Sequence, residues 1–214
     1  MTAVRLIAVT RPLDPTLSPQ GLVEYCARVS NPQGQAAPRE PGRLLAYLMR
    51  EGHWSPLEMV HAVVEVECPR DIARQLLRHR SFAFQEHSQR YERAPGFALR
   101  GARRQGSTNR QSSTDDLAED VRVWWAEAQA DLLGRAADLY ADALDRGVAR
   151  ECARVILPEG LTLSRLYMAG SLRSWVHYLA VREAEGTQAE HREVARAIRA
   201  ALAAEFPLLG EDGR

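Results

Sequence analysis

The chain has 214 residues, of which 45% are hydrophobic and 26% charged, so it fits one globular domain with its own core and not a disordered chain. Its 28 basic residues, all arginine, balance 28 acidic ones, which argues against sequence-independent nucleic-acid binding, because such proteins usually carry a net basic charge. No run reaches membrane-spanning length and the first residues lack the pattern of a secretory signal, so we expect no membrane association and a cytoplasmic location.

The hydrophobic pattern of the first half predicts two strands and three helices. In chain order these are a strand at 4–9, a helix capped by Ser18, a turn-rich break at 34–41, a helix at 44–48 that ends near Gly52, a loop at 53–56, a strand at 60–68 and a helix opened by Pro69 and Asp71. The last helix is expected to present Gln75 and Arg78 on one polar face, because residues three apart are neighbours on a helix.

The second half begins with a segment rich in glycine, serine and arginine at 94–114. We expect a mobile loop there, which could either close over anionic substrates with its arginines or be a solvated insertion. A long scaffold helix is predicted at 121–143, with Trp124 and Trp125 in the core. It is followed by a helix at 150–154, a strand at 162–168, a helix with Arg173 and His177, and an amphipathic helix at 188–206. The mixture indicates an α+β fold, a single domain with several long helices packed on a small antiparallel or mixed sheet.

Three cysteines, Cys26, Cys68 and Cys152, are widely spaced and form no Cys-x-x-Cys pair. This argues against disulfides and against a structural metal, and each cysteine is expected to be a small buried hydrophobe. Histidines His61 and His191 are interpreted as structural.

The segment from Arg78 to Tyr91 reads RHRSFAFQEHSQRY and is the most informative part of the chain. Arginine forks bind phosphate or carboxylate through bidentate, charge-assisted hydrogen bonds, while neighbouring aromatic rings exclude water. From residue types alone, a surface turn with a few core aromatics explains the segment equally well.

The order of these residues, Arg-His-Arg followed after seven residues by Ser88 and Gln89-Arg90-Tyr91, resembles the signature of the flavin-dependent thymidylate synthases. Further blocks of the same family occur in the same order and at similar spacing. They are Ala27–Ser30, Gly52-His53, Ser55–Glu58, Arg150–Arg154 and Arg173–Arg182.

The resemblance implies an enzyme that converts dUMP to dTMP, with FAD as redox cofactor, methylenetetrahydrofolate as carbon donor and NADPH as reductant. It also implies a single family domain over residues 1–214 and a homotetramer whose sites combine several subunits. Arg182 is the expected catalytic residue, because a fixed positive charge at the pyrimidine raises electron density at C5. The implied flavin contacts are His53, Ser55, Arg78, His79, Arg80, Glu86, Ser171, Arg173 and His177. The implied dUMP contacts are Gln75, Arg78, Glu86, His87, Ser88, Gln89, Arg90, Arg154 and Arg182.

Three positions depart from the family pattern: Ala83, Ser171 and Gly186 stand where serine, asparagine and histidine are usual. Weaker flavin retention is the expected consequence, because each departure removes a polar or stacking contact. Ser88 has no activating base beside it, so we expect it to hydrogen-bond the substrate rather than attack it. Two alternatives stay open: an arginine-rich RNA-binding module, and a homologue that binds flavin or nucleotide without turnover.

Overall fold

A four-stranded antiparallel sheet organises the chain in the computed structural model, which describes residues 2–36 and 42–210. The strand order is β1-β2-β6-β3, and a separate hairpin pairs β4 with β5. The strands are β1 (Ala3–Val9), β2 (His61–Pro69), β3 (Ala83–Glu86), β4 (Arg104–Gln105), β5 (Ser113–Thr114) and β6 (Leu163–Ser171). The α+β class predicted from the sequence is confirmed, and β3 and the small hairpin are additions that the sequence did not reveal.

The alternation in β2 explains which face of the sheet becomes the core. Ala62, Val64, Val66 and Cys68 are buried on one face, and Val64 pairs with Met168 of β6. Because side chains alternate between the two faces of a strand, one face of the sheet is continuously apolar. The predicted strand at 60–68 is therefore confirmed.

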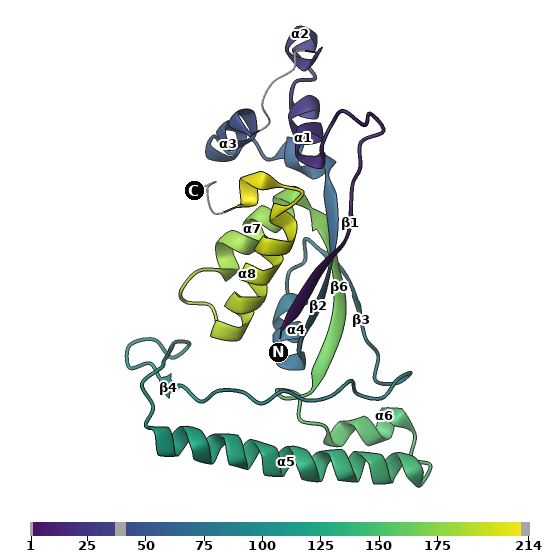
Figure 1. Cartoon of the computed structure of the whole chain (residues 1–214), viewed down its shortest axis with the longest axis vertical. Coiled ribbons are helices and arrows are strands. Elements are labelled where there is room, and N and C mark those ends of the chain that lie inside the picture. Colours follow the sequence, from purple (N-terminus) through teal and green to yellow (C-terminus); the bar gives the residue numbers. More distant parts are fainter. Residues whose placement is uncertain (1, 37–41, 211–214) are drawn as a thin grey trace.

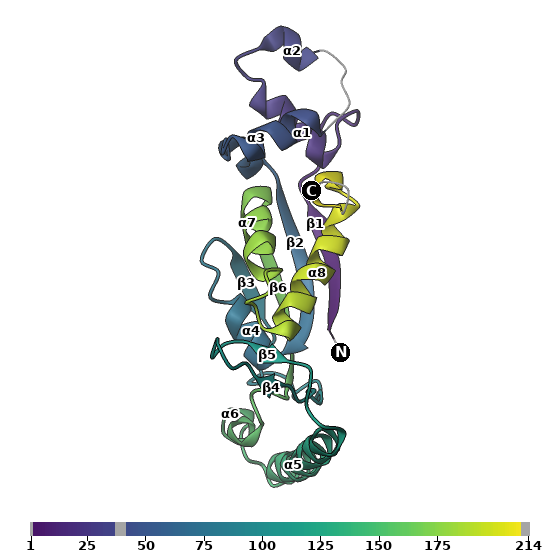
Figure 2. The ribbon, with the colours of Figure 1, turned by 90° about the vertical axis from the view of Figure 1, so that its left-hand side faces the viewer.

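Helices α4 (Arg70–Leu76), α7 (Leu172–Arg182) and α8 (Ala189–Ala203) cover this apolar face. Figures 1 and 2 show α7 and α8 lying side by side against the sheet. Trp175 of α7 is fully buried, and its indole Nε1 donates to the Gly170 carbonyl at 3.1 Å. The core is therefore a two-layer arrangement, while Arg5 and Ile7 on β1 remain exposed on the other face.

A group of short helices forms one end of the molecule (Figure 1). These are α1 (Pro19–Ala27), α2 (Pro32–Ala36), α3 (Arg43–Arg50), the 3-10 helix η1 (Ser55–Met59) and the C-terminal 3-10 helix η3 (Pro207–Leu209). Ser18 caps α1 as predicted, because its Oγ accepts from the Gly21 amide at 2.9 Å. The predicted break at 34–41 is wrong for residues 34–36, which lie in α2, and residues 37–41 lie outside the described residues. The predicted loop at 53–56 is shortened by η1.

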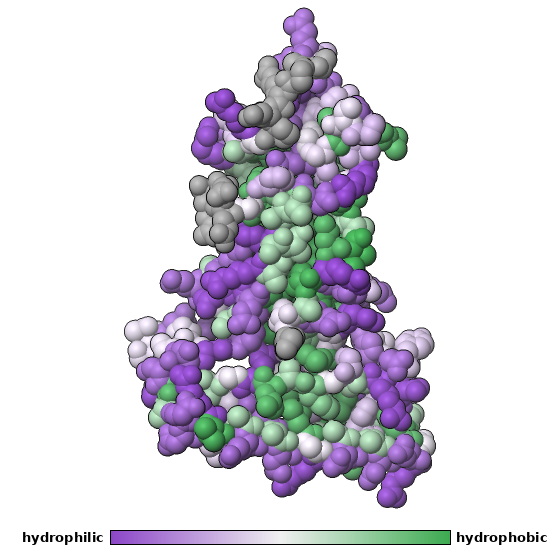
Figure 3. Space-filling model, in the orientation of Figure 1, coloured by the Kyte–Doolittle hydropathy of each residue, from purple (hydrophilic) through white to green (hydrophobic). Residues whose placement is uncertain are grey.

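The long helix α5 (Glu119–Asp145) crosses the opposite end of the sheet, with α6 (Arg150–Ala153) and the 3-10 helix η2 (Arg154–Ile156) beside it. The prediction that Trp124 and Trp125 are core residues is wrong for the single chain, in which they are 61% and 38% exposed. The reason is that α5 lies across the end of the sheet rather than on its apolar face. Figure 3 shows apolar surface between the lower end of the sheet and α5.

The cysteines behave differently from one another. Cys68 is buried as expected, but Cys26 is only half-buried and Cys152 is exposed, because α6 lies at the edge of the molecule. Burial raises the pKa of the Cys68 thiol to about 12, so it does not supply a thiolate nucleophile. In residues 2–36 and 42–210 all three cysteines are free and no metal-ligand cluster occurs. Within the same residues, no helix combines the length and apolarity needed to cross a membrane.

Candidate active site

The central arginine-rich segment begins where α4 ends, against the helices α7 and α8. Gln75 lies in the last turn of α4, and Arg78 follows the helix, with its amide donating to the Gln75 carbonyl at 3.3 Å. His79 packs edge-on against Tyr178 of α7, with ring centres 5.0 Å apart. Arg182, at the end of α7, donates from Nε to His79 Nε2 at 2.8 Å. The fold therefore brings together four chain segments at one junction.

The contact between Arg182 and His79 fixes the state of the imidazole. Burial, and then the charge of Arg182, lower the pKa of His79 to about 4, so the ring is neutral at neutral pH. Because Nε2 accepts the arginine proton, the ring proton must be on Nδ1. Arg182 is thus anchored through Nε by a neutral partner. No carboxylate among the described residues pairs with its guanidinium, so the two terminal nitrogens can donate to an anionic ligand.

Gln75 belongs to the same junction through contacts from α8. Its Nε2 donates to Gln188 Oε1 at 2.7 Å, and its Oε1 lies 3.1 Å from His191 Nδ1. His191 is fully buried, and burial lowers its pKa to about 4. Sequence reasoning assigned no site role to Gln188 or His191, because neither belongs to a motif and their partners lie more than 100 positions away.

A second group surrounds a cavity of about 540 Å³ at the start of α7. Ser171 caps this helix, with its Oγ accepting from the Ser174 amide at 3.3 Å. Arg173 donates to Glu58 at 2.9 Å, and a hydrogen bond from Ser171, together with Arg173, lowers the pKa of Glu58. The cavity is lined by Trp54, Glu58, Ser81, Arg173, Ser174, Val176, His177 and Ala180.

The remaining flavin-motif residues flank this cavity in the chain. Ser55 begins η1 directly after Trp54, and Arg80 directly precedes Ser81. His53 is exposed and lies edge-on to Tyr47, with ring centres 6.4 Å apart. The cavity thus offers the rings of Trp54 and His177 beside one arginine, Arg173.

A third group lies at the far end of β3. Glu86 accepts from Ser164 Oγ at 2.9 Å and lies 3.4 Å from Arg70 and 3.9 Å from Arg74. These contacts direct the carboxylate toward α4. The strand explains this position, because β3 pairs from Ala83↔Ala169 to Glu86↔Leu166 and so carries Glu86 away from the start of α7.

The loop after β3 contacts α6. Arg90 lies 3.3 Å from Glu151, and Arg154 follows α6 directly. Ser88 Oγ accepts from the Arg90 amide at 3.3 Å, with no base hydrogen-bonded to it in the described part of the chain. Gln89 is buried, and its Nε2, like Nδ1 of His87, has no partner among the described residues.

Within one chain, these three groups are held by separate sets of contacts. Among the described residues, no hydrogen bond or ion pair joins Glu86–Arg90 to Arg182 or to the cavity at the start of α7. The structure therefore brings Gln75, Arg78, His79 and Arg182 together, but it leaves residues 86–90 and Arg154 at a different place.

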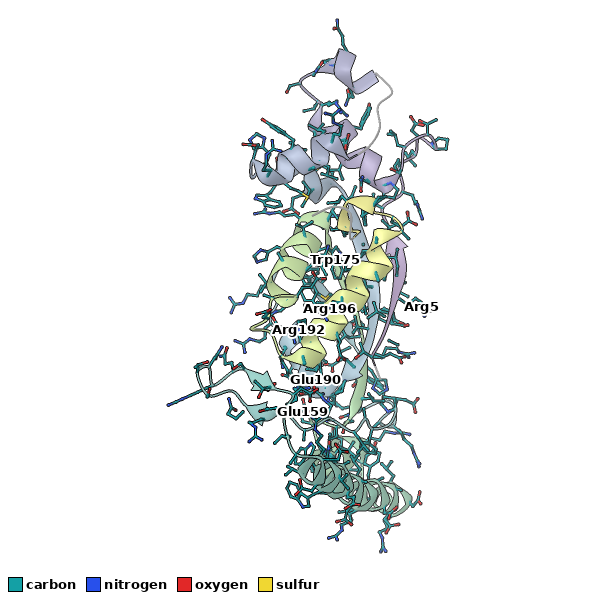
Figure 4. All side chains as sticks on the ribbon, turned by 60° about the vertical axis from the view of Figure 1, so that its left-hand side comes forward. Arg5, Glu159, Trp175, Glu190, Arg192 and Arg196 are labelled. Carbon is teal, nitrogen blue, oxygen red and sulfur yellow. The ribbon has the colours of Figure 1, made fainter. Side chains whose placement is uncertain are left out.

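The segment 94–118, which we call the strap, runs from the β3 end to α5 and is tied to the body. Arg100 lies 3.1 Å from both Asp71 and Glu190, and Arg103 lies 2.7 Å from Glu190. Gln129 of α5 bonds both backbone groups of Arg100, at 2.9 and 2.8 Å. Figure 4 shows Glu190 at the lower end of α8, where the strap passes. The mobility of residues 94–114 stays a prediction.

The Glu190 carboxylate is stabilised in its ionised form by several hydrogen bonds. Burial alone would raise the pKa of its carboxyl, but hydrogen bonds from its backbone amide, Arg103 and Gln188 lower it to about 2. The strap arginines Arg100 and Arg103 are therefore already neutralised by carboxylates. This arrangement does not support the alternative in which these two arginines close over anionic substrates.

Comparison with known proteins shows the family to which the chain belongs. Residues 12–208 match the family model described as Thymidylate synthase complementing protein, Thy1. The flavin-dependent thymidylate synthase of Synechocystis sp. is 49% identical over 208 residues, which cover 95% of both chains. The probable flavin-dependent thymidylate synthase of Paramecium bursaria Chlorella virus 1 is 42% identical, over 98% of this chain and 97% of its own.

Among solved structures, the UMP/dUMP methylase PolB from Streptomyces cacaoi, bound with 5-Br dUMP, is similar with a TM-score of 0.80 and 26% identity. The match covers 96% of this chain and 91% of PolB. The fold and the matches place the chain in a class of enzymes, the thymidylate synthases that depend on a flavin. Within that class, it belongs to the Thy1 family.

Proposed function

We propose that this enzyme methylates dUMP to dTMP, with FAD as redox cofactor, methylenetetrahydrofolate as carbon donor and NADPH as reductant. The names of the relatives support the flavin and the product, and the PolB structure supports a uridylate substrate. The observation that carries the proposal is the junction of Arg182, His79 and Gln75. There, a permanent cation is anchored by a neutral imidazole beside an amide.

The cavity at the start of α7 suits FAD. Trp54, Val176 and His177 offer ring and apolar surface, while Arg173 and Ser81 offer donors for a pyrophosphate. Bound FAD would supply the redox and one-carbon transfer chemistry, which the chain itself cannot provide. The proposed flavin ligands are His53, Ser55, Arg78, His79, Arg80, Glu86, Ser171, Arg173 and His177.

For dUMP, the protein's work is to bind, orient and polarise. Arg182 would face the N3 and O4 edge of the uracil, where its positive charge stabilises negative charge that develops in the ring and raises electron density at C5. Gln75 would hydrogen-bond the same edge, and Ser88 would position the nucleotide without attacking it. Arg154, with Arg78 or Arg90, would bind the phosphate, and Glu86, His87 and Gln89 would complete the pocket.

We propose that complete sites form in a homotetramer. Support comes from the separation of the three groups within one chain and from exposed apolar side chains on and beside α5. These side chains are Val121, Val123, Trp124, Trp125, Leu132, Leu139 and Val155. Large exposed apolar patches are typical of subunit interfaces. Replacing Trp124 with glutamate is expected to lower the mass in sedimentation experiments, whereas an unchanged mass would contradict this interface. Cytoplasmic location remains our prediction.

The function is tested in two steps with the purified chain. Flavin uptake is followed by visible absorbance, and we expect one FAD per chain. Release of tritium from C5-labelled dUMP is then measured with methylenetetrahydrofolate, FAD and NADPH, and NADH in place of NADPH tests the reductant. Flavin binding without tritium release would favour the homologue that lacks turnover. A chain that binds RNA but no flavin would favour the RNA-binding module.

A further inference from the structure

Three side chains connect the strap to the buried His191 in one continuous line of hydrogen bonds. Gln188 Nε2 donates to Glu190 at 3.0 Å, Gln75 Nε2 donates to Gln188 Oε1 at 2.7 Å, and Gln75 Oε1 lies 3.1 Å from His191 Nδ1. We call Glu190, Gln188, Gln75 and His191 the amide chain. It joins α4 to α8 across the junction where Arg182 lies.

The Glu190 carboxylate determines which group donates and which accepts in each hydrogen bond of the amide chain. The Glu190 carboxylate only accepts, because its pKa is far below neutral, so Gln188 must turn its NH₂ group toward it. Gln188 then offers Oε1 to the NH₂ group of Gln75, and Gln75 offers Oε1 to His191, which must carry its proton on Nδ1. Each amide orientation follows from the one before it, starting from Glu190.

The far end of the amide chain agrees with this assignment. His191 is fully buried, and its Nε2 has no hydrogen-bond partner within residues 2–36 and 42–210. An unprotonated Nε2 is the less costly state there, because a buried N–H without an acceptor loses its bond to water. A neutral ring with the proton on Nδ1 satisfies both nitrogens as well as the site allows.

We propose that Gln188 and Glu190 are positioning residues that hold the Gln75 carboxamide in one orientation toward the uracil of dUMP. This inference rests on the proposed function. After its two bonds in the amide chain, Gln75 retains one N–H and one lone pair. Uracil presents an acceptor at O4 beside a donor at N3. A carboxamide held in one orientation can place its N–H toward O4 and its oxygen toward N3, whereas a freely rotating carboxamide can also present the two groups in the reverse order.

The same carboxylate receives the strap. Arg100 and Arg103 donate to Glu190, so docking of the strap and orientation of Gln75 depend on one residue. Asp71 provides a matched control, because it anchors Arg100 at the same distance of 3.1 Å and takes no part in the amide chain.

The experiment uses variants of the full chain. It measures dUMP turnover by steady-state tritium release and dUMP binding by equilibrium dialysis with labelled dUMP. For Gln188→Met we expect KM and Kd to rise about tenfold with kcat changed less than about threefold, because one directing hydrogen bond is lost. The Gln75→Leu variant should have the same constants, within about twofold, with and without the Gln188 change, because residues that act through one another are not additive. If Gln188 had a purely structural role, Gln188→Met would raise KM and Kd in the Gln75→Leu background as well, and this result would overturn the proposal.

A second pair of variants keeps the test independent of any folding defect caused by the Gln188 substitution. Glu190→Gln and Asp71→Asn should both increase cleavage of the strap by trypsin, but only Glu190→Gln should weaken dUMP binding. Equal weakening in both variants would show that the strap alone sets the affinity, and would refute the amide chain. Wild-type chain that binds dUMP but releases no tritium would refute the proposed reaction, while the dialysis comparison would still decide the role of Gln188.

Discussion

The buried His191 and the partly buried His79 predict that the stability of the chain depends on pH between 5 and 7. His191 has a pKa of about 4 in the folded chain, against an ordinary value of 6.5. It faces His79, Tyr178 and Arg182 from the neighbouring elements. Because the unfolded chain binds the proton more tightly, stability is full above pH 6.5 and decreases as the pH falls toward 4. Between pH 7 and pH 5, His191 alone should remove about 2 kcal/mol from the free energy of unfolding.

His79 acts in the same direction, because its pKa is also lowered to about 4, but its partial exposure makes its effect smaller. The measurement is urea unfolding at pH 5, 6 and 7 with protein concentration held constant, since association also affects the midpoint. His191→Leu should flatten the dependence, whereas the exposed His61→Asn should leave it unchanged. An equal wild-type midpoint at pH 5 and pH 7, or an unaltered slope in His191→Leu, would refute the assignment of a neutral buried ring.

Three substitutions test other parts of the structure. Arg182→Ala should slow single-turnover methylation by about 100-fold or more, because the fixed charge at the pyrimidine is lost; a near-normal rate would exclude that role. Gly170→Ala should destabilise by about 1 to 3 kcal/mol in urea unfolding, because the new Cβ would lie 2.5 Å from the Phe82 ring, whereas Gly134→Ala in α5, with open space around it, should stabilise slightly. Ser88→Ala should keep activity within about tenfold, and complete loss despite retained dUMP binding would indicate a covalent role.

Local sequence signals predicted the elements that depend on local chemistry. The alternation from Val60 to Cys68 identified β2, and the hydroxyl of Ser18 identified the start of α1, because burial and capping leave periodic or short-range patterns. The position of α5 could not be found in this way. Its apolar spacing predicts a helix with an apolar face, but whether Trp124 meets this chain's own core or another surface depends on tertiary placement.

The same limit applies to the site. The family resemblance predicted site roles for Arg78, His79 and Arg182, although it assigned His79 to the flavin and Arg182 to dUMP. The structure places all three at one junction. The sequence did not predict site roles for Gln188 and Glu190, because a glutamine and a glutamate at the start of a helix are common. Their hydrogen-bond and ion-pair partners are distant in the sequence and are brought close only by the fold. β3 was missed because its four residues are too few to show a period.

The chain has equal numbers of basic and acidic residues, but its arginines differ in whether a carboxylate lies within ion-pair distance. This difference indicates where anions can bind. Arg100, Arg103 and Arg104 of the strap each lie within ion-pair distance of a carboxylate. Among residues 2–36 and 42–210, several other arginines lack such a partner, and they include four of the predicted site residues. These four are Arg78, Arg80, Arg154 and Arg182.

An arginine without a carboxylate keeps its charge available for a ligand, and Arg182 meets only a neutral imidazole. Arg78, Arg80, Arg154 and Arg182 belong to the blocks that resemble the family, whereas Arg90 and Arg173 of the same blocks are each paired with a glutamate. Arg100 and Arg103 therefore hold the strap in place, while Arg78, Arg80, Arg154 and Arg182 remain available for phosphate, pyrophosphate or an ionised pyrimidine. It also favours Arg154 over Arg90 as the phosphate ligand, because Arg90 must first leave Glu151.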